Sequence, residues 1–400
     1  MNLKHILTMI KFHKFFALVI ILQVTLSMSV VSNSFFLGLK VYKEWSLAEG
    51  IVPEELITIS AKTYQPGANF QSLLTEDLDE LSKIKGVKGV TPINLTPIAA
   101  GWPNTIYDSE GENKTSLQTH IFNVDSNGLN VLGLKLIEGR NFNSIDVKYS
   151  DGSEQPNVVM LSEAMAEELF SDSDAIGKTI WLAEDSSPVE VIGIYSNFIS
   201  SQFLAAKGMP YRSILQPKVV WHRENAQSYI IRVEPGTAGS VKNAISDHYA
   251  QIVGRTGGRP DSLADVKWQV FFERVGTFLM YMTISALLLI ITFCGLIGLI
   301  NFIVSTRKGQ IATRRALGAK VSRIIWEFIT ENMVITVVGI LFGLLFTVVI
   351  SSMFREFNGL VAADLVYALV VAVVICLLNA IAVTISVRKT VKRQPSELLI

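Results

Sequence analysis

The chain has 400 residues, half of them apolar, and its mean hydropathy of +0.39 is high for a soluble globular protein. Its 35 basic and 35 acidic side chains cancel, so bulk charge gives no reason to expect a nucleic-acid partner. The only cysteines, Cys294 and Cys376, both lie in apolar runs, which excludes a disulfide framework and a cysteine-based zinc site. These figures favour a membrane protein.

The first apolar run, residues 15–39, is long enough to cross a bilayer. It has no charged side chain over 25 residues, and about 20 are needed. The preceding segment 1–14 carries Lys4, Lys11 and Lys14, a basic start that a cleaved signal peptide would share. Because the apolar core of a signal peptide is only about 7 to 15 residues, the length favours an uncleaved membrane anchor.

Residues 40–274 are more polar and rich in turn signals, and we expect them to form a mixed α/β domain. Apolar periodicity predicts three helices, at 73–84, 162–170 and 239–252. Short β-rich runs predict strands at 158–161, 179–182, 189–195 and 228–233, and one that starts within 86–90. The remaining segments 197–218 and 254–261 are predicted to be a loop or flap and a flexible exit.

A search for motifs of catalysis or metal binding finds none. The run Ile176-Gly177-Lys178-Thr179 resembles the end of a phosphate loop, but such a loop needs glycine at position 172, where Asp172 stands. The five histidines show no metal-ligand spacing. Asp77, Asp79 and Glu80 form an acidic group on a predicted helix, which we interpret as a solvated face rather than a catalytic pair. We therefore predict a non-catalytic chain without a metal or cofactor.

Three further charge-free runs follow, at 275–306, 332–354 and 365–387. The third membrane helix is predicted over 324–354, so it begins ahead of its charge-free run. At 1.5 Å per residue, the 32-residue run 275–306 would form a helix of about 48 Å, longer than a hydrocarbon core of roughly 30 Å. The excess predicts either a stalk outside the membrane or a tilted helix.

Basic residues flank these spans unevenly, and short cytoplasmic loops are the ones that carry a Lys/Arg excess. Segment 307–323 has no acid and contains six basic residues: Arg307, Lys308, Arg314, Arg315, Lys320 and Arg323. The tail 388–400 is also basic, whereas the short loop 355–364 is not. We therefore predict that both termini and 307–323 are cytoplasmic, and that 40–274 and 355–364 lie outside.

The basic segment between the second and third spans predicts a helix followed by a turn. Residues 307–317 can form the helix, Gly318 can cap its end, and Ala312 and Ala316 make a smooth stripe along it. The residues alone leave two interpretations open. The segment either meets another protein surface, or its arginines follow the positive-inside rule and bind lipid phosphates.

Polar and small residues inside the spans favour helix packing. Gly339 and Gly343 form a GxxxG spacing, which lets two helices approach closely, although the sequence does not name the partner helix. Gln23, Asn301 and Asn379 are interpreted as interhelical hydrogen-bond formers rather than as a substrate path. The spans carry no charge pair, which argues against an ion-coupled transporter or a channel.

Several segments together resemble the MacB/FtsX-type permease family of ABC transporters. Thr313-Arg314-Arg315-Ala316-Leu317-Gly318-Ala319 is similar to the family signature R-R-A-L-G-A. The other similar segments are 158–170 followed by 176–179, 132–142, and the tail 394–399 with its P-S-E-x-L pattern. The order of one span, a large outer domain and three spans also agrees, and the resemblance favours the stalk for 275–306.

In this family the signature lies on a cytoplasmic coupling element that contacts the ATPase subunit. The resemblance therefore implies that role for Arg314, Arg315, Ala316, Leu317, Gly318 and Ala319. Gln310 departs from the family, which usually has an acid four positions before the first arginine, and this puts a charge-assisted contact there in doubt. Only 14 residues precede the first span, so we expect the ATPase, which binds the ATP, to be a separate chain.

The resemblance implies a bacterial inner-membrane permease subunit that pairs with a second copy or a paralogue and works with a periplasmic adaptor. ATP-driven closure of the partner would move segment 307–323, and the spans would carry that displacement outward as mechanotransmission. Efflux of an antimicrobial peptide or a macrolide-like amphiphile is the expected work. The alternatives are a lipoprotein-releasing permease and a non-transporting regulator that transmits force to a cell-wall hydrolase.

Overall fold

The computed structural model describes residues 14–64, 69–109, 115–150, 154–170, 174–182, 188–201, 209–220, 226–358 and 365–391. The chain divides into two compact units. One, here called the α/β domain, is Glu44–Glu273; the other, here called the helical unit, combines Met1–Lys43 with Arg274–Ile400. The predicted segment 1–14, apart from Lys14, and the tail motif 394–399 lie outside the described residues.

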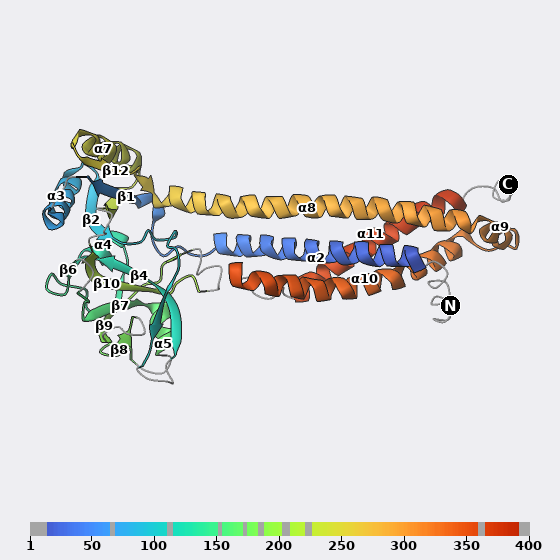
Figure 1. Ribbon diagram of the computed structural model, residues 1–400, viewed down its shortest axis with the longest axis horizontal. Coiled ribbons are helices and arrows are strands. Elements are labelled where there is room, and N and C mark those ends of the chain that lie inside the picture. Colours follow the sequence, from blue (N-terminus) through green and yellow to red (C-terminus); the bar gives the residue numbers. More distant parts are fainter. Residues whose placement is uncertain are drawn as a thin grey trace. The chain divides into compact units, whose positions relative to one another are not determined.

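The first sheet of the α/β domain is antiparallel, with the order β12-β1-β11-β2, and β13 also pairs with β1. Its strands are β1 (Leu56–Thr63), β2 (Val87–Ile93), β11 (Ala226–Val233), β12 (Arg255–Gly257) and β13 (Asp261–Ser262). Helices α3 (Phe70–Lys83) and α7 (Ala238–Gln251) lie together beside this sheet (Figure 1). Side chains alternate along β1. Ile57 and Ile59 belong to the apolar cluster that includes side chains of α3 and α7, and Leu56 belongs to a second apolar cluster, so both faces of the strand are buried.

The second sheet is mixed, with the order β4-β3-β8-β9-β7-β10-β6, and a further pairing of β4 with β10 closes six of its strands into a ring. Its strands are β3 (Asn104–Tyr107), β4 (Ser116–Val124), β5 (Leu136–Gly139), β6 (Lys148–Ser150), β7 (Val158–Ser162), β8 (Thr179–Trp181), β9 (Pro188–Tyr195) and β10 (Ser213–Val220). The described part of the domain also includes three short helices: η1 (Pro53–Glu55), α4 (Gly128–Leu132) and α5 (Glu163–Leu169). The mixed α/β fold predicted for this part of the chain is confirmed.

Two predictions of irregular structure in this domain are wrong. Part of the expected loop 197–218 is strand β10, whose side chains are buried from Ser213 to Val219. Pro217 suggested a turn, but it pairs with Val124 of the parallel neighbour β4 and is compatible with the strand. The expected flexible exit 254–261 contains β12 and begins β13, because β1 offers both of them a pairing edge.

The acidic group on α3 is only in part the solvated face that we predicted: Asp79 is exposed and Glu80 is partly exposed, but Asp77 is buried. Asp77 is 1% exposed, because its position three after Leu74 and four before Leu81 places it on the buried face of the helix. Its carboxylate accepts a hydrogen bond of 2.7 Å from the Tyr229 hydroxyl and one from the buried guanidinium of Arg255. Burial and the neighbouring carboxylate raise the pKa of Tyr229, so its hydroxyl stays a donor.

We predict that Asp77→Ala lowers the free energy of unfolding of the α/β domain by about 3 to 5 kcal/mol, because it leaves the Arg255 charge buried without a counter-ion. The measurement is urea titration with pulse proteolysis of the detergent-purified chain. Asp79→Ala is the matched control: Asp79 is 62% exposed and pairs only with Lys83 among the described residues, so its effect should stay within about 0.5 kcal/mol. Equal effects of the two substitutions would contradict the role assigned to Asp77.

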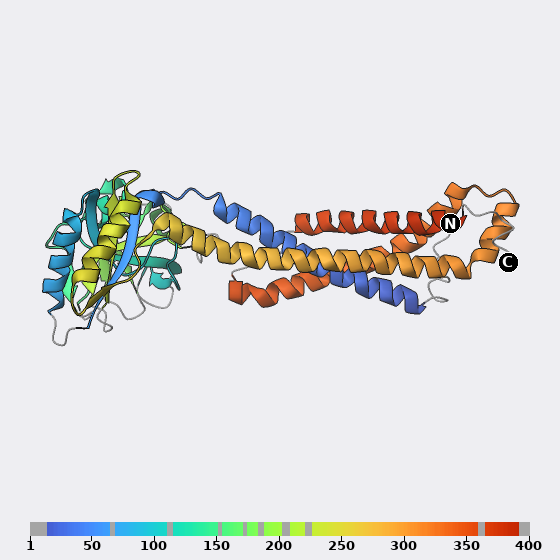
Figure 2. The ribbon, with the colours of Figure 1, turned by 90° about the horizontal axis from the view of Figure 1, so that it is seen from above.

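The part of the chain that the structure describes contains four helices that are long and apolar enough to cross a membrane, and most of their length lies in the helical unit. They are α2 (Lys14–Trp45), α8 (Leu263–Thr306), α10 (Val321–Asn358) and α11 (Leu365–Val391), with the shorter α9 (Lys308–Ala316) between α8 and α10 (Figure 2). All four predicted spans fall within these helices. Residues 355–358 of the expected outer loop belong to α10 instead, and 359–364 lie outside the described residues.

Polar side chains inside these helices bond to one another. Ser27 of α2 is 2.6 Å from the Thr292 hydroxyl of α8, and the Ser285 hydroxyl donates to Ser34 over 2.7 Å. Asn379 of α11 donates to Thr336 of α10. These pairs satisfy polar groups that a hydrocarbon environment would leave without partners. Helix α8 has 44 residues and is therefore about 66 Å long. Whether part of it forms the predicted stalk depends on where the membrane crosses the helix, so the stalk stays a prediction.

Candidate functional site

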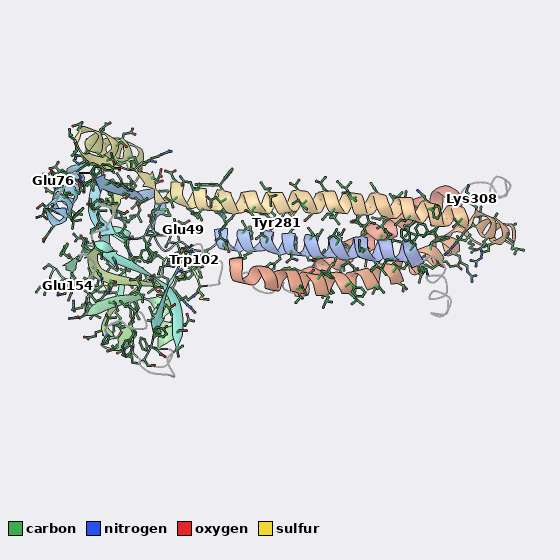
Figure 3. The ribbon with its side chains drawn as sticks, in the orientation of Figure 1. Glu49, Glu76, Trp102, Glu154, Tyr281 and Lys308 are labelled. Carbon is green, nitrogen blue, oxygen red and sulfur yellow. The ribbon has the colours of Figure 1, made fainter. Side chains whose placement is uncertain are left out.

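Helix α9 is a basic stretch of the helical unit and connects two membrane-length helices. It begins one residue after Arg307, at the end of α8, and it is nine residues long. Lys308, at its first position, is marked in Figure 3. Because α10 begins at Val321, α9 and the turn after it occupy the segment between two spans that the sequence predicts to be a helix followed by a turn.

The turn after α9 is set by a glycine. Gly318 has a φ of +89°, in the left-handed region that side chains with a Cβ atom rarely adopt. Its N–H donates to the carbonyl of Arg315 over 3.0 Å, and the N–H of Ala319 donates to the carbonyl of Arg314 over 3.0 Å. This pair of bonds is the Schellman motif, which ends a helix while satisfying its last carbonyl groups. The chain can therefore turn back at once into α10.

The inner face of α9 packs against α10 through apolar side chains. Ile311 and Ala312 are buried, and Ile311 belongs to the same cluster as Ile324 and Phe328 of α10. The guanidinium of Arg307 lies over the Phe328 ring, 5.5 Å from its centroid. Together α9 and the first turns of α10 form an antiparallel helical hairpin, here called the α9–α10 hairpin.

Two ion pairs join the helices of this hairpin. Arg307 Nη1 lies 2.9 Å from Glu331 Oε2, and Arg314 Nη1 lies 2.8 Å from Glu327 Oε2. The side chains of the first pair are only 12% and 18% exposed, whereas those of the second are 58% and 31% exposed. Solvent therefore screens the second pair more strongly. Arg314 thus has a carboxylate partner on α10, although Gln310 on its own helix supplies none.

The residues of the R-R-A-L-G-A signature lie on different sides of α9. Arg314 faces Glu327, Arg315 is half-buried with no hydrogen-bond partner for its Nε among the described residues, and Ala319 is half-buried against the apolar cluster of the helical unit. Arg314 is nevertheless exposed, as are Ala316, Leu317 and Gly318. Leu317 is 83% exposed, so it is an unpartnered apolar side chain at the tip of the hairpin. No described contact tests the coupling role of these residues.

Sequence reasoning missed Glu327 and Glu331 as part of this site. A signal was present: both acids are four residues apart on one face of a helix that is otherwise apolar over its span. Both acids precede the charge-free run that begins at residue 332. The positive-inside rule concerns basic residues and gives no reason for acids at this end of a span. Their pairing with Arg307 and Arg314 requires the turn at Gly318, which periodicity alone does not place.

The GxxxG residues of α10 lie against α2. A Cβ atom added at Gly339 would come within 2.9 Å of the Val24 Cβ, and one added at Gly343 within 2.5 Å of the Met28 Cβ. The hydroxyl of Thr25 donates to the Gly339 carbonyl over 3.1 Å. The two helices are therefore close enough that only hydrogen fits at both glycines, and we propose that the pair serves packing within one chain.

We predict that Gly343→Ala destabilises the detergent-solubilised chain by about 1 to 3 kcal/mol, because the new methyl group overpacks the contact with Met28. Gly298→Ala in α8 is the matched control, since a Cβ there meets nothing within 4 Å and only helix propensity improves, by up to about 1 kcal/mol. The measurement is thermal unfolding followed by circular dichroism. A Gly343→Ala variant that melts at or above the temperature of Gly298→Ala would contradict this packing.

Among the described residues, no group of three or more His, Cys, Asp or Glu side chains could hold a metal ion. A small cavity in the α/β domain is lined by Asp77, Arg255 and Tyr229, and it offers about 20 Å³ to the centre of a water molecule. That volume suits about one water and is far below that of a substrate pocket.

Comparisons with known proteins agree with this architecture. Residues 18–248 match the family model for the MacB-like periplasmic core domain, and residues 282–395 match the model for the FtsX-like permease C-terminal region. The chain is 26% identical over 315 residues to the macrolide export ATP-binding/permease protein MacB of Neisseria gonorrhoeae, covering 76% of this chain and 45% of that protein. It is 26% identical over 286 residues to the ABC transporter permease YknZ of Bacillus subtilis, covering 70% and 66% respectively.

The periplasmic region of MacB from Actinobacillus actinomycetemcomitans is similar in structure, with a TM-score of 0.34 and 18% identity over 57% of this chain and 97% of that one. The chain spans about half the length of the MacB relatives that it matches. Four membrane-length helices with a MacB-like α/β domain define a multi-pass membrane permease of the ABC type. The chain belongs to the MacB/FtsX-like family of ABC transporter permeases.

Proposed function

We propose that this chain is the membrane-spanning subunit of an ABC transporter and that its α9–α10 hairpin is the docking element for the ATPase. The observation that carries the proposal is the position of α9, which links two membrane-length helices and presents Ala316, Leu317 and Gly318 to solvent at its tip. An ABC permease has to receive force from ATP hydrolysis. A compact helix that connects the ends of two spans can pass such a force to both of them.

The proposed orientation follows from the basic residues beside the spans. Segment 307–323 and both termini lie in the cytoplasm of a bacterial cell, and the α/β domain lies across the inner membrane. This puts α9 on the side where ATP is found. The family models support the orientation, because one is described as periplasmic and matches the part of the chain that holds the α/β domain.

The proposed assembly has two permease chains, either identical or paralogous, and a separate ATPase chain that binds the ATP. The names of the relatives allow both arrangements: MacB is named an ATP-binding/permease protein, whereas YknZ is named a permease. The 400 residues contain no phosphate-loop sequence, so the ATP of the proposed assembly binds outside them. A periplasmic adaptor is a further proposed partner.

Efflux of an amphiphile, such as an antimicrobial peptide or a macrolide-like compound, is the proposed work. The macrolide export named for MacB supports it, although that relative is only 26% identical. Lipoprotein release and force transmission to a cell-wall hydrolase use the same coupling and remain the second candidates. A deletion strain that becomes sensitive to macrolides or cationic peptides supports efflux, whereas unchanged sensitivity together with a cell-separation defect supports the regulator.

We predict that Leu317→Asp lowers recovery of the ATPase with the affinity-purified permease about tenfold or more, because an exposed leucine buried at an interface contributes about 1.5 to 3 kcal/mol. The fold of the permease should be unchanged, since the side chain is 83% exposed. Recovery is measured by quantitative mass spectrometry after purification in mild detergent.

Ile145→Asp is the matched control, because Ile145 is equally exposed, at 85%, but lies in the α/β domain. Its ATPase recovery should equal that of the unmodified chain. If Leu317→Asp and the unmodified chain recover the same amount of ATPase, or if the unmodified chain recovers none, the docking role of α9 is rejected.

A further inference from the structure

The charged residues of the α9–α10 hairpin follow the geometry of an antiparallel helix pair. Arg307 is the N-cap of α9 and Arg314 lies seven residues later, about two helical turns along, and both side chains reach carboxylates of α10. Glu327 and Glu331 are four apart and share a face of α10. The earlier arginine pairs with the later glutamate and the later arginine with the earlier glutamate, as an antiparallel arrangement requires.

An apolar seam lies between the two ion pairs. Ile311 is halfway between the arginines, is 4% exposed, and clusters with Ile324 and Phe328. Phe328 also carries the Arg307 guanidinium on its ring, so this arginine is held by a carboxylate and by an aromatic face. A guanidinium with two such partners and 12% exposure is strongly oriented, in contrast to a lipid-binding arginine on a free surface.

We propose that Arg307, Glu331, Arg314 and Glu327 form a brace that fixes α9 against α10, and that these are positioning residues which do not themselves contact the ATPase. The inference deepens the proposed function and rests on it: the brace would hold the exposed, uncharged tip in its docking position. A push on that tip would then move α10 as one body with α9. Arg314 of the signature thus serves the permease itself, and Leu317 serves the partner.

A brace and a direct contact make opposite demands on the charges. If Arg307 contacted an acidic ATPase residue or a lipid phosphate, a positive charge would be needed at position 307 itself, whatever stands at 331. If it braces the hairpin, only the complementarity of the two positions matters. Exchanging the charges separates these cases, because Arg307→Glu with Glu331→Arg keeps the pair and reverses its polarity.

The experiment compares Arg307→Glu, Glu331→Arg and the double exchange in the full detergent-purified chain. Two quantities are measured: hydrogen–deuterium exchange of the amides of 308–316, and recovery of the ATPase. We expect each single reversal to raise amide exchange and to lower ATPase recovery about fivefold or more, and the double exchange to restore at least about half of both. The pair Arg314 and Glu327 is less suited, since Arg323 lies 3.8 Å from Glu327 and would repel an arginine there.

Lys308→Glu is the matched control. It makes the same change of charge on α9, but Lys308 is exposed and has no ion pair among the described residues, so amide exchange should be unchanged. Glu331→Gln provides a milder variant that removes the ion pair while keeping the size of the side chain. It should raise amide exchange even if the full reversals do not fold.

The two readouts keep the inference separate from the proposed function. Unchanged amide exchange in Glu331→Gln, or a double exchange that restores neither quantity, would refute the brace. Amide exchange that responds while ATPase recovery does not would refute its positioning role. If the unmodified chain recovers no ATPase, the proposed function fails, and the amide exchange still decides whether the brace exists.

Discussion

The hydrocarbon core of a bilayer offers no partner for a backbone N–H or C=O group, and this constraint shapes the whole helical unit. Each span must be a continuous helix, and the polar side chains within it must bond to neighbouring helices, as Ser27 does with Thr292 and Asn379 with Thr336. Charged groups are confined to the ends. The segment between α8 and α10 is therefore a place where this unit can hold charged side chains, and the basic signature lies there.

Within that segment α9 is amphipathic in the usual way: Ile311 and Ala312 are buried, whereas Lys308 and Arg314 are exposed. The departure is Leu317, an apolar side chain that is 83% exposed directly after the helix ends. The contacts continue from α9 to α10 and, through Gly339 and Gly343, from α10 to α2, so the hairpin is tied to the helices that it would have to move.

The sequence predicts those features that depend on composition and local periodicity. Charge-free runs place all four spans, and the glycine at position 318 predicts the end of α9, because both signals are local. It fails where long-range pairing decides the structure: β10 is a strand because β4 and β7 lie on both sides of it, and Pro217 conceals this. The partners of the arginines were missed for the same reason, since Glu327 and Glu331 approach them only after the chain reverses.

The two ends of the α/β domain are far apart in sequence but adjacent in the fold. Strand β1 lies near the beginning of the domain, and β13 leads directly into α8; the pairing of Ile57 with Ser262 makes the two ends neighbours in one sheet. The buried pair of Asp77 and Arg255 then fastens α3 to β12 at the edge of that sheet. A force applied at one end is thereby shared with the other strands across hydrogen bonds. Under the proposed coupling, tension between the two ends would act on the antiparallel ladder of β1 and β11, and separating them would require breaking its hydrogen bonds.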